Sequence, residues 1–156
     1  MTESLSSLRA LCLANGASKE QALATFEDSW NTNPLVMDKW FAVQAATGTA
    51  EDVEQLLTHK DFDLSNPNRV RSVIAVFAMQ NLPAFHAPDG SGYALVTRVI
   101  EHADKKNPAL AARLLTAFEQ WKLLEPQARN AAEAALQQRR QYLDSDCDSR
   151  ANMTTG

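Results

Sequence analysis

Two Asn-Pro pairs, Asn66-Pro67 and Asn107-Pro108, are the features that most constrain the fold of this chain. In each pair an asparagine, which can cap a helix, precedes a proline, whose fixed φ suits the first helical position. The first pair is followed by Val70, Ile74 and Phe77, which recur at the spacing of one helix face. No segment of useful length alternates apolar and polar residues as a half-buried strand does. We therefore predict an all-α fold.

The same punctuation divides the chain into about eight helices. Their expected starts lie near Thr2, Ser18, Pro34, Thr49, Pro67, Ser91, Pro108 and Pro126. The segment 81–91 is the longest predicted loop. The two Asn-Pro starts lie about 41 residues apart, which suits antiparallel helix pairs stacked as a HEAT-like array. An irregular helical bundle is the alternative.

Composition predicts one globular domain and sets limits on its partners. The chain has 156 residues, of which 45% are hydrophobic, enough for a core of its own. Its net charge of -4 gives no electrostatic attraction for nucleic acid, and no apolar run suffices to cross a membrane. Cys12 and Cys147 lack metal-ligand spacing, so we expect unpaired thiols in a reducing compartment. Residues 1–15 lack a charged region followed by an apolar one, so we expect no secretory signal and a cytoplasmic protein. Residues 1–143 form the expected helical domain, and the polar residues 144–156 a disordered tail.

Several blocks of the chain, in order, resemble the C-terminal helical domain of the bacterial aminopeptidase N family of zinc metallopeptidases. They include Leu35-Val-Met-Asp-Lys-Trp-Phe41, Asn66-Pro-Asn-Arg-Val-Arg-Ser72 and Ala84-Phe-His-Ala-Pro-Asp-Gly-Ser-Gly-Tyr93. The resemblance runs from about Ser4 to about Leu136. It implies a HEAT/armadillo-like superhelix that belongs to a larger enzyme.

The catalytic motif of such enzymes, His-Glu-x-x-His, would place two zinc ligands and a general base on one helix. That motif is absent here, because no two of His59, His86 and His102 lie four residues apart. We therefore expect no catalytic residue, no metal and no cofactor in this chain, with zinc held by the parent enzyme. The resemblance implies that the chain caps the active-site chamber, that its partners are the catalytic domain and peptide substrates, and that the parent removes N-terminal amino acids. A free-standing HEAT-like interaction module is the alternative.

The arginines are the main candidates for substrate contacts. Arg69 and Arg71 fall on opposite flanks of the apolar stripe of their helix, at 100° per residue. By their residues alone, both could instead pair with nearby acids such as Asp61 and Asp63, or lie in solvent. The resemblance implies that Arg71 and Arg113 line the enclosed cavity, where a guanidinium can bind the C-terminal carboxylate of a peptide.

The segment around His86 and Asp89 has a metal-binding and a structural interpretation. Two ligands on a loop are too few for a zinc site. The structural interpretation makes Asp89 or Ser91 the cap of the next helix and has Phe85 and Tyr93 pin the loop to the core. We expect the structural role.

Overall fold

The computed structural model describes residues 2–14, 16, 18–119, 126, 129–138 and 140–141. The described residues are helical or lie in turns and loops, and none of them is in a strand. The chain divides into two compact units, Met1–Phe85 and His86–Gly156. The predicted disordered tail, residues 144–156, lies outside the described residues, as do Trp121 and Cys147.

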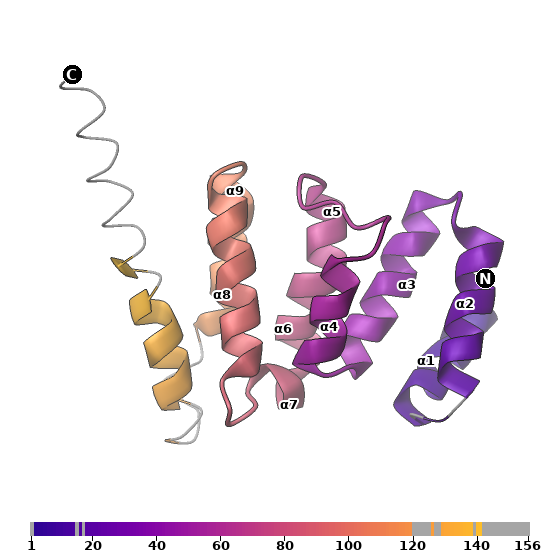
Figure 1. Ribbon diagram of the computed structural model, residues 1–156, viewed down its shortest axis with the longest axis horizontal. Coiled ribbons are helices and arrows are strands. Elements are labelled where there is room, and N and C mark those ends of the chain that lie inside the picture. The colour runs from indigo at the N-terminus through magenta and orange to yellow at the C-terminus, as the bar shows by residue number, and fades with distance from the viewer. Residues whose placement is uncertain are drawn as a thin grey trace. The chain divides into compact units, whose positions relative to one another are not determined.

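The first unit contains seven α-helices and a short π-helix among its described residues. In chain order these are α1 (Thr2–Ala14), α2 (Ser18–Trp30), α3 (Pro34–Thr47), α4 (Ala50–Leu57), α5 (Pro67–Val70), the π-helix η1 (Arg71–Ala75), α6 (Val76–Gln80) and α7 (Leu82–Phe85). Helices α1, α2 and α3 lie side by side in the indigo-to-violet part of Figure 1 and contact one another. Short connections between consecutive helices produce this side-by-side packing.

Local hydrogen bonds explain where these helices begin. The Asn66 side chain accepts from the backbone N–H groups of Asn68 and Arg69, and Pro67 follows it at the first helical position. Asn33 caps α3 in the same way, although only the two later Asn-Pro pairs were expected to share the device. Thr49 and Asp52 form a reciprocal capping box at the start of α4. The expected helix starts at Pro34 and Pro67 are confirmed, and α4 begins at Ala50, one residue after the expected Thr49.

Helix α3 forms the centre of the first unit. It contacts α1, α2, α4, α5, η1 and α6. Its buried residues span about half of its circumference at 100° per residue, as expected for a helix with neighbours on several sides. They are Val36, Met37, Trp40, Phe41 and Ala45. The Trp40 indole N–H donates to the Leu23 carbonyl at 3.0 Å, so α2 and α3 are joined by a buried hydrogen bond as well as by apolar packing.

The helix that follows Asn66 is less regular than predicted. Instead of one α-helix to about Met79, the chain forms α5, the five-residue π-helix η1 and then α6. The widened turn is visible where the Val76 N–H donates to the Arg71 carbonyl, five residues back. Such turns are rare in proteins, and those that occur often lie at functional sites. Apolar spacing does not reveal one inserted residue, so the sequence prediction missed it.

The second unit contains α8 (Ser91–Asp104), α9 (Pro108–Leu115) and the 3₁₀ turn η2 (Thr116–Phe118), followed by helical residues within 126–141. Helices α8 and α9 run side by side, and Asn107 caps α9 through the Leu110 N–H. The α8 face toward the core carries Tyr93, Val96 and Ile100, all buried. Gly90, the residue before α8, has φ of 73°, a conformation that favours glycine. The expected cap by Asp89 or Ser91 is wrong, because Gly90 is the N-cap and no described side chain caps the helix.

The predicted loop 81–91 is partly helical, because α7 occupies Leu82–Phe85. The expectation of a long loop was therefore wrong. Asn81 precedes α7 and Pro83 lies in its first turn, where a proline does not prevent a helix. Asn81 instead has a tertiary role. Its side-chain Nδ2 donates to the carbonyls of Ala45, at 3.0 Å, and Gly48, at 2.6 Å, and so ties α7 to the end of α3.

Candidate functional site

Arg71 is exposed at the start of η1, and its guanidinium lies along its own helix. Nε donates to the Pro67 carbonyl at 3.0 Å, and Nη2 donates to Oδ1 of Asn68 at 2.8 Å. Its Nη1 makes no hydrogen bond to a described residue. These neutral local partners hold the side chain in one orientation without neutralising its charge, so Arg71 can still attract an anion. Of the two alternatives for Arg71, pairing with Asp61 or Asp63 is not seen, and the exposed side chain matches the expectation that it lies in solvent.

Arg69, two residues earlier, is buried and serves the core. Its side chain is 7% exposed, and Nε lies 2.8 Å from Oδ1 of Asp38. Its guanidinium also lies over the Phe41 ring, 4.6 Å from the ring centroid. The 2.8 Å contact is an ion pair without an aligned hydrogen bond, because Nε and Nη1 of Arg69 and Oδ1 of Asp38 are buried with no hydrogen-bond partner among the described residues. Arg69 therefore pairs with an acid, as one alternative expected, but its partner is Asp38 of α3 and not Asp61 or Asp63.

Arg113 lies near the end of α9 and is exposed. Its backbone carbonyl accepts a hydrogen bond from the Thr116 hydroxyl at 2.8 Å, which tightens the end of the helix. Arg71 belongs to the first unit and Arg113 to the second. The substrate-binding role of both residues stays a prediction.

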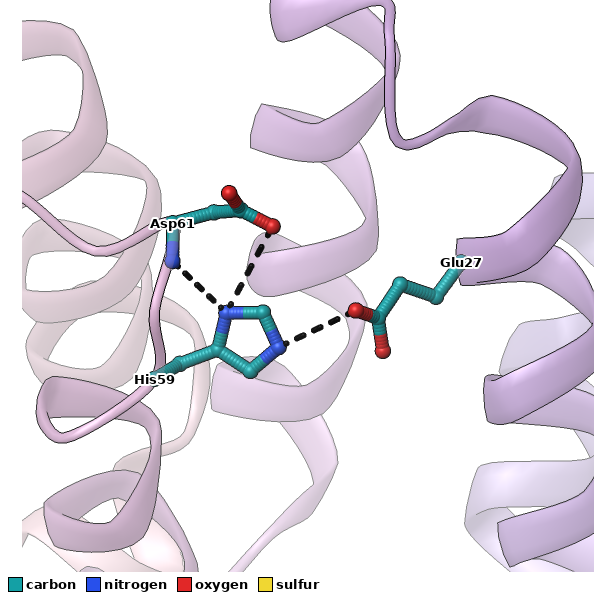
Figure 2. Close-up of side chains that lie close together, drawn as sticks. All are labelled: Glu27, His59 and Asp61. Atoms are coloured by element: carbon teal, nitrogen blue, oxygen red, sulfur yellow. Dashed lines mark hydrogen bonds and ion pairs between the residues drawn. The ribbon is translucent and has the colours of Figure 1, made fainter.

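A cluster that sequence analysis did not single out joins α2 to the loop after α4. Figure 2 shows the His59 ring between the carboxylates of Glu27, on α2, and Asp61, in the same loop as His59. His59 Nε2 lies 3.4 Å from Oε1 of Glu27, and Nδ1 lies 3.9 Å from Oδ2 of Asp61. The ring packs against Trp40 and Phe41, with centroids 5.2 and 5.3 Å away. Glu27 and His59 are far apart in the sequence, so no local motif could have revealed the cluster.

The hydrogen bonds of this cluster decide which ring nitrogen carries the proton in neutral His59. The backbone N–H of Asp61 donates to Nδ1 at 3.1 Å, so Nδ1 is an acceptor. The proton then resides on Nε2, which faces Glu27. The ammonium of Lys60 lies 3.0 Å from the same Glu27 oxygen, and this hydrogen bond raises the pKa of Lys60. The cluster is thus a paired network that fastens the loop to α2.

Glu27, His59 and Asp61 are the one group among the described residues whose ligand atoms lie close enough, within 4.8 Å of one another, to suggest a metal site. Their geometry does not fit a catalytic zinc. The two ring nitrogens of His59 point toward different carboxylates (Figure 2). An ion bound to Nε2 would lie on the Glu27 side of the ring, so Asp61, on the Nδ1 side, could not bind the same ion. Lys60 already occupies the Glu27 oxygen. We assign the group a structural role.

The loop of His86 and Asp89 is also structural. Asp89 Oδ1 accepts from the Ser91 backbone N–H at 3.0 Å and from its hydroxyl at 2.8 Å, which turns the chain into α8. These hydrogen bonds lower the pKa of Asp89. His86 Nδ1 lies 2.6 Å from the Tyr93 hydroxyl, and burial lowers the pKa of His86. Phe85 and Tyr93 are both fully buried, as expected for residues that pin the loop.

Comparison with known proteins places the chain in a family. Residues 1–146 match the family described as "Domain of unknown function (DUF3458_C) ARM repeats". The chain is 39% identical over 141 residues to aminopeptidase N of Escherichia coli (strain K12) and 36% identical over 140 residues to aminopeptidase N of Caulobacter vibrioides. Each alignment covers 88% of this chain and 16% of the relative.

A solved structure agrees with these relatives. The crystal structure of Legionella pneumophila aminopeptidase A in complex with aspartic acid matches with a TM-score of 0.83 at 34% identity. The match covers 89% of this chain and 17% of that one. The fold is thus an all-α array of the ARM-repeat class, and the chain belongs to the DUF3458_C family. It corresponds to the C-terminal helical domain of aminopeptidases and spans about a sixth of the relatives' length. Within the described residues, no helix is both long enough and apolar enough to traverse a membrane.

Proposed function

We propose that this chain is the non-catalytic C-terminal domain of a zinc-dependent, cytoplasmic aminopeptidase that removes N-terminal amino acids from peptides. The observation that carries the proposal is the 39% identity with aminopeptidase N across 88% of the chain. The zinc, which would activate water for attack on the peptide bond, would be held outside this chain, because its sequence has no His-Glu-x-x-His. The catalytic domain would then be its main partner, and this domain would cap the active-site chamber.

Within that enzyme, we assign Arg71 and Arg113 to the wall of the peptide channel. Both side chains are exposed in the described structure, so neither is committed to the core. Arg71 is also held along its helix by Pro67 and Asn68, so binding a carboxylate would immobilise few further side-chain torsions. The role is electrostatic positioning of the far end of a peptide and not bond making.

The test is to replace Arg71 or Arg113 with alanine in the assembled enzyme and to compare a tetrapeptide with an amino-acid amide. Loss of one charge-assisted contact costs about 1.5–3 kcal/mol, so the peptide KM should rise by about tenfold or more. The amide should be affected little, because it has no distant carboxylate. The effect should also shrink for a peptide whose C-terminus is amidated.

Arg9→Ala is the matched control, because Arg9 is an exposed arginine on α1 that matches none of the quoted family blocks. It should leave the ratio of peptide to amide KM unchanged. If Arg71→Ala and Arg113→Ala alter the amide as strongly as the tetrapeptide, these arginines support the fold and the channel proposal is wrong.

A further inference from the structure

A groove lies between α1 and α2, on a side of the helix pair that α3 does not occupy. Its volume is 480 Å³. The α1 residues that line the groove recur every three or four positions and so lie on one face of the helix: Ser4, Ser7, Leu8 and Leu11. The α1 residues that line the shallower hollow against α3 are different ones, Leu5, Ser6 and Arg9. Helix α1 therefore presents two separate faces, one toward α3 and one toward the groove.

The α2 wall of the groove follows the same helical spacing. Its residues include Ser18, Ala22, Thr25, Phe26 and Ser29. Trp30, at the end of this row, is only partly buried, and Leu11 on the α1 wall is 37% exposed. None of the described residues that line the groove is charged, although charged residues make up 22% of the chain. Depletion of charge around aromatic and aliphatic side chains is typical of the centre of an interface.

Two hydroxyl groups on the α2 wall, those of Thr25 and Ser29, are already satisfied within the helix, while the exposed side chain of Gln21 also lines this wall. The Thr25 hydroxyl donates to the Gln21 carbonyl at 2.8 Å, and the Ser29 hydroxyl donates to the Thr25 carbonyl at 2.8 Å. Covering these hydroxyls would therefore break no hydrogen bond donated to water. Small side chains such as Ser7, Ala22 and Ser29 also allow the backbone of another helix to approach closely.

We propose that the α1–α2 groove is the docking site of an apolar helix from the part of the aminopeptidase polypeptide outside the matched region. This inference rests on the proposed function. Two observations select this occupant. The chain matches only 16% of its relatives, so most of the parent polypeptide is available to cover the groove. In addition, ARM repeats bury their apolar faces against neighbouring repeats, so a further helix is the partner whose shape and chemistry fit.

The test uses Escherichia coli aminopeptidase N in which the matching region is replaced by this chain. Ala22→Arg places a charge in the groove, whereas Ala24→Arg makes the same change at an exposed position of α2 outside it. In the chimaera, Ala22→Arg should lower Tm by at least about 3 °C relative to Ala24→Arg. In the isolated chain the difference in Tm between the two variants should be smaller, because Ala22 is there only half-buried and Ala24 is exposed.

A second measurement does not depend on a substitution. Hydroxyl-radical oxidation of Trp30 should be severalfold slower in the chimaera than in the isolated chain, because a docked helix would cover the indole. Equal oxidation rates, or equal Tm values for the two chimaera variants, would overturn the inference. Self-association of the isolated chain that Ala22→Arg abolishes, with Trp30 accessible in the chimaera, would overturn it in favour of a second copy as occupant.

These outcomes separate the docking inference from the channel proposal. A chimaera in which Trp30 is protected, but in which Arg71→Ala and Arg113→Ala leave the peptide KM unchanged, supports docking and refutes the channel role. A chimaera with the expected peptide KM changes and an accessible Trp30 refutes docking and supports the channel role.

Discussion

The buried ion pair of Arg69 and Asp38 gives the strongest prediction about stability. Asp38→Asn keeps the shape of the side chain and removes its charge, which leaves the 7% exposed guanidinium of Arg69 without an anion. Breaking a buried pair in this way costs about 3–5 kcal/mol. Asp38 is itself 19% exposed, so water screens part of the attraction and we expect a loss near the lower limit, about 3 kcal/mol.

The same geometry predicts unequal effects for the two partners. Arg69→Met should cost less than Asp38→Asn, because the carboxylate left behind retains some contact with water whereas the guanidinium does not. Arg69→Met also loses the contact over Phe41, worth about 0.5–2 kcal/mol. The double variant Asp38→Leu with Arg69→Met should lie within about 1 kcal/mol of the wild type, because apolar replacement of a buried pair is often neutral.

Urea denaturation followed by circular dichroism measures these free energies of unfolding. Arg71→Met is the matched control, since it removes an exposed arginine two residues away and should cost about 0.5 kcal/mol or less. The reasoning would be refuted if Asp38→Asn cost no more than Arg71→Met. It would be equally refuted if the double variant were as unstable as the sum of the single variants, because the two charges would then be independent.

Two further predictions concern other buried polar groups. Asn81→Ala removes both donors to the carbonyls of Ala45 and Gly48 and should lower the free energy of unfolding by about 1–3 kcal/mol in urea denaturation, with Asn81→Asp at least as damaging because a carboxylate would face the two carbonyls. Burial lowers the pKa of His86 below its ordinary value of 6.5, so the unfolded chain binds the proton more readily than the folded chain. The contribution of neutral His86 to stability is therefore fully present above pH 6.5 and is lost as the pH falls through the lower folded pKa. His86→Gln should flatten this acid-side decline in pH-dependent melting, and an unchanged slope would contradict the assignment.

Much of the local structure could be predicted from the sequence because it depends on contacts within a few residues. Asn66 and Asn107 cap their helices through backbone N–H groups two or three residues ahead, and each is followed by a proline. Apolar residues at helical spacing, such as Val70, Val73 and Ile74, are fully buried. The resemblance to the aminopeptidase N family, based on residue blocks, is confirmed by the family match and by the relatives.

The pairing of distant side chains was decided by tertiary structure alone. Arg69 and Arg71 are alike by sequence, yet Arg69 is buried against Asp38 while Arg71 is exposed along its own helix. The one-residue widening of η1 changes the direction of the side chains around it, and no periodicity of apolar residues records it. His59 meets Glu27 only because α2 packs beside α3 and the loop after α4.

Local rules therefore determine where most of the described helices begin, although not α7, and which of their faces is apolar. They do not determine which charges meet across the core or which apolar face is left open between α1 and α2. The physical reason is that capping and helical spacing depend on hydrogen bonds and side chains within about one turn, whereas ion pairs and grooves depend on how the completed helices pack.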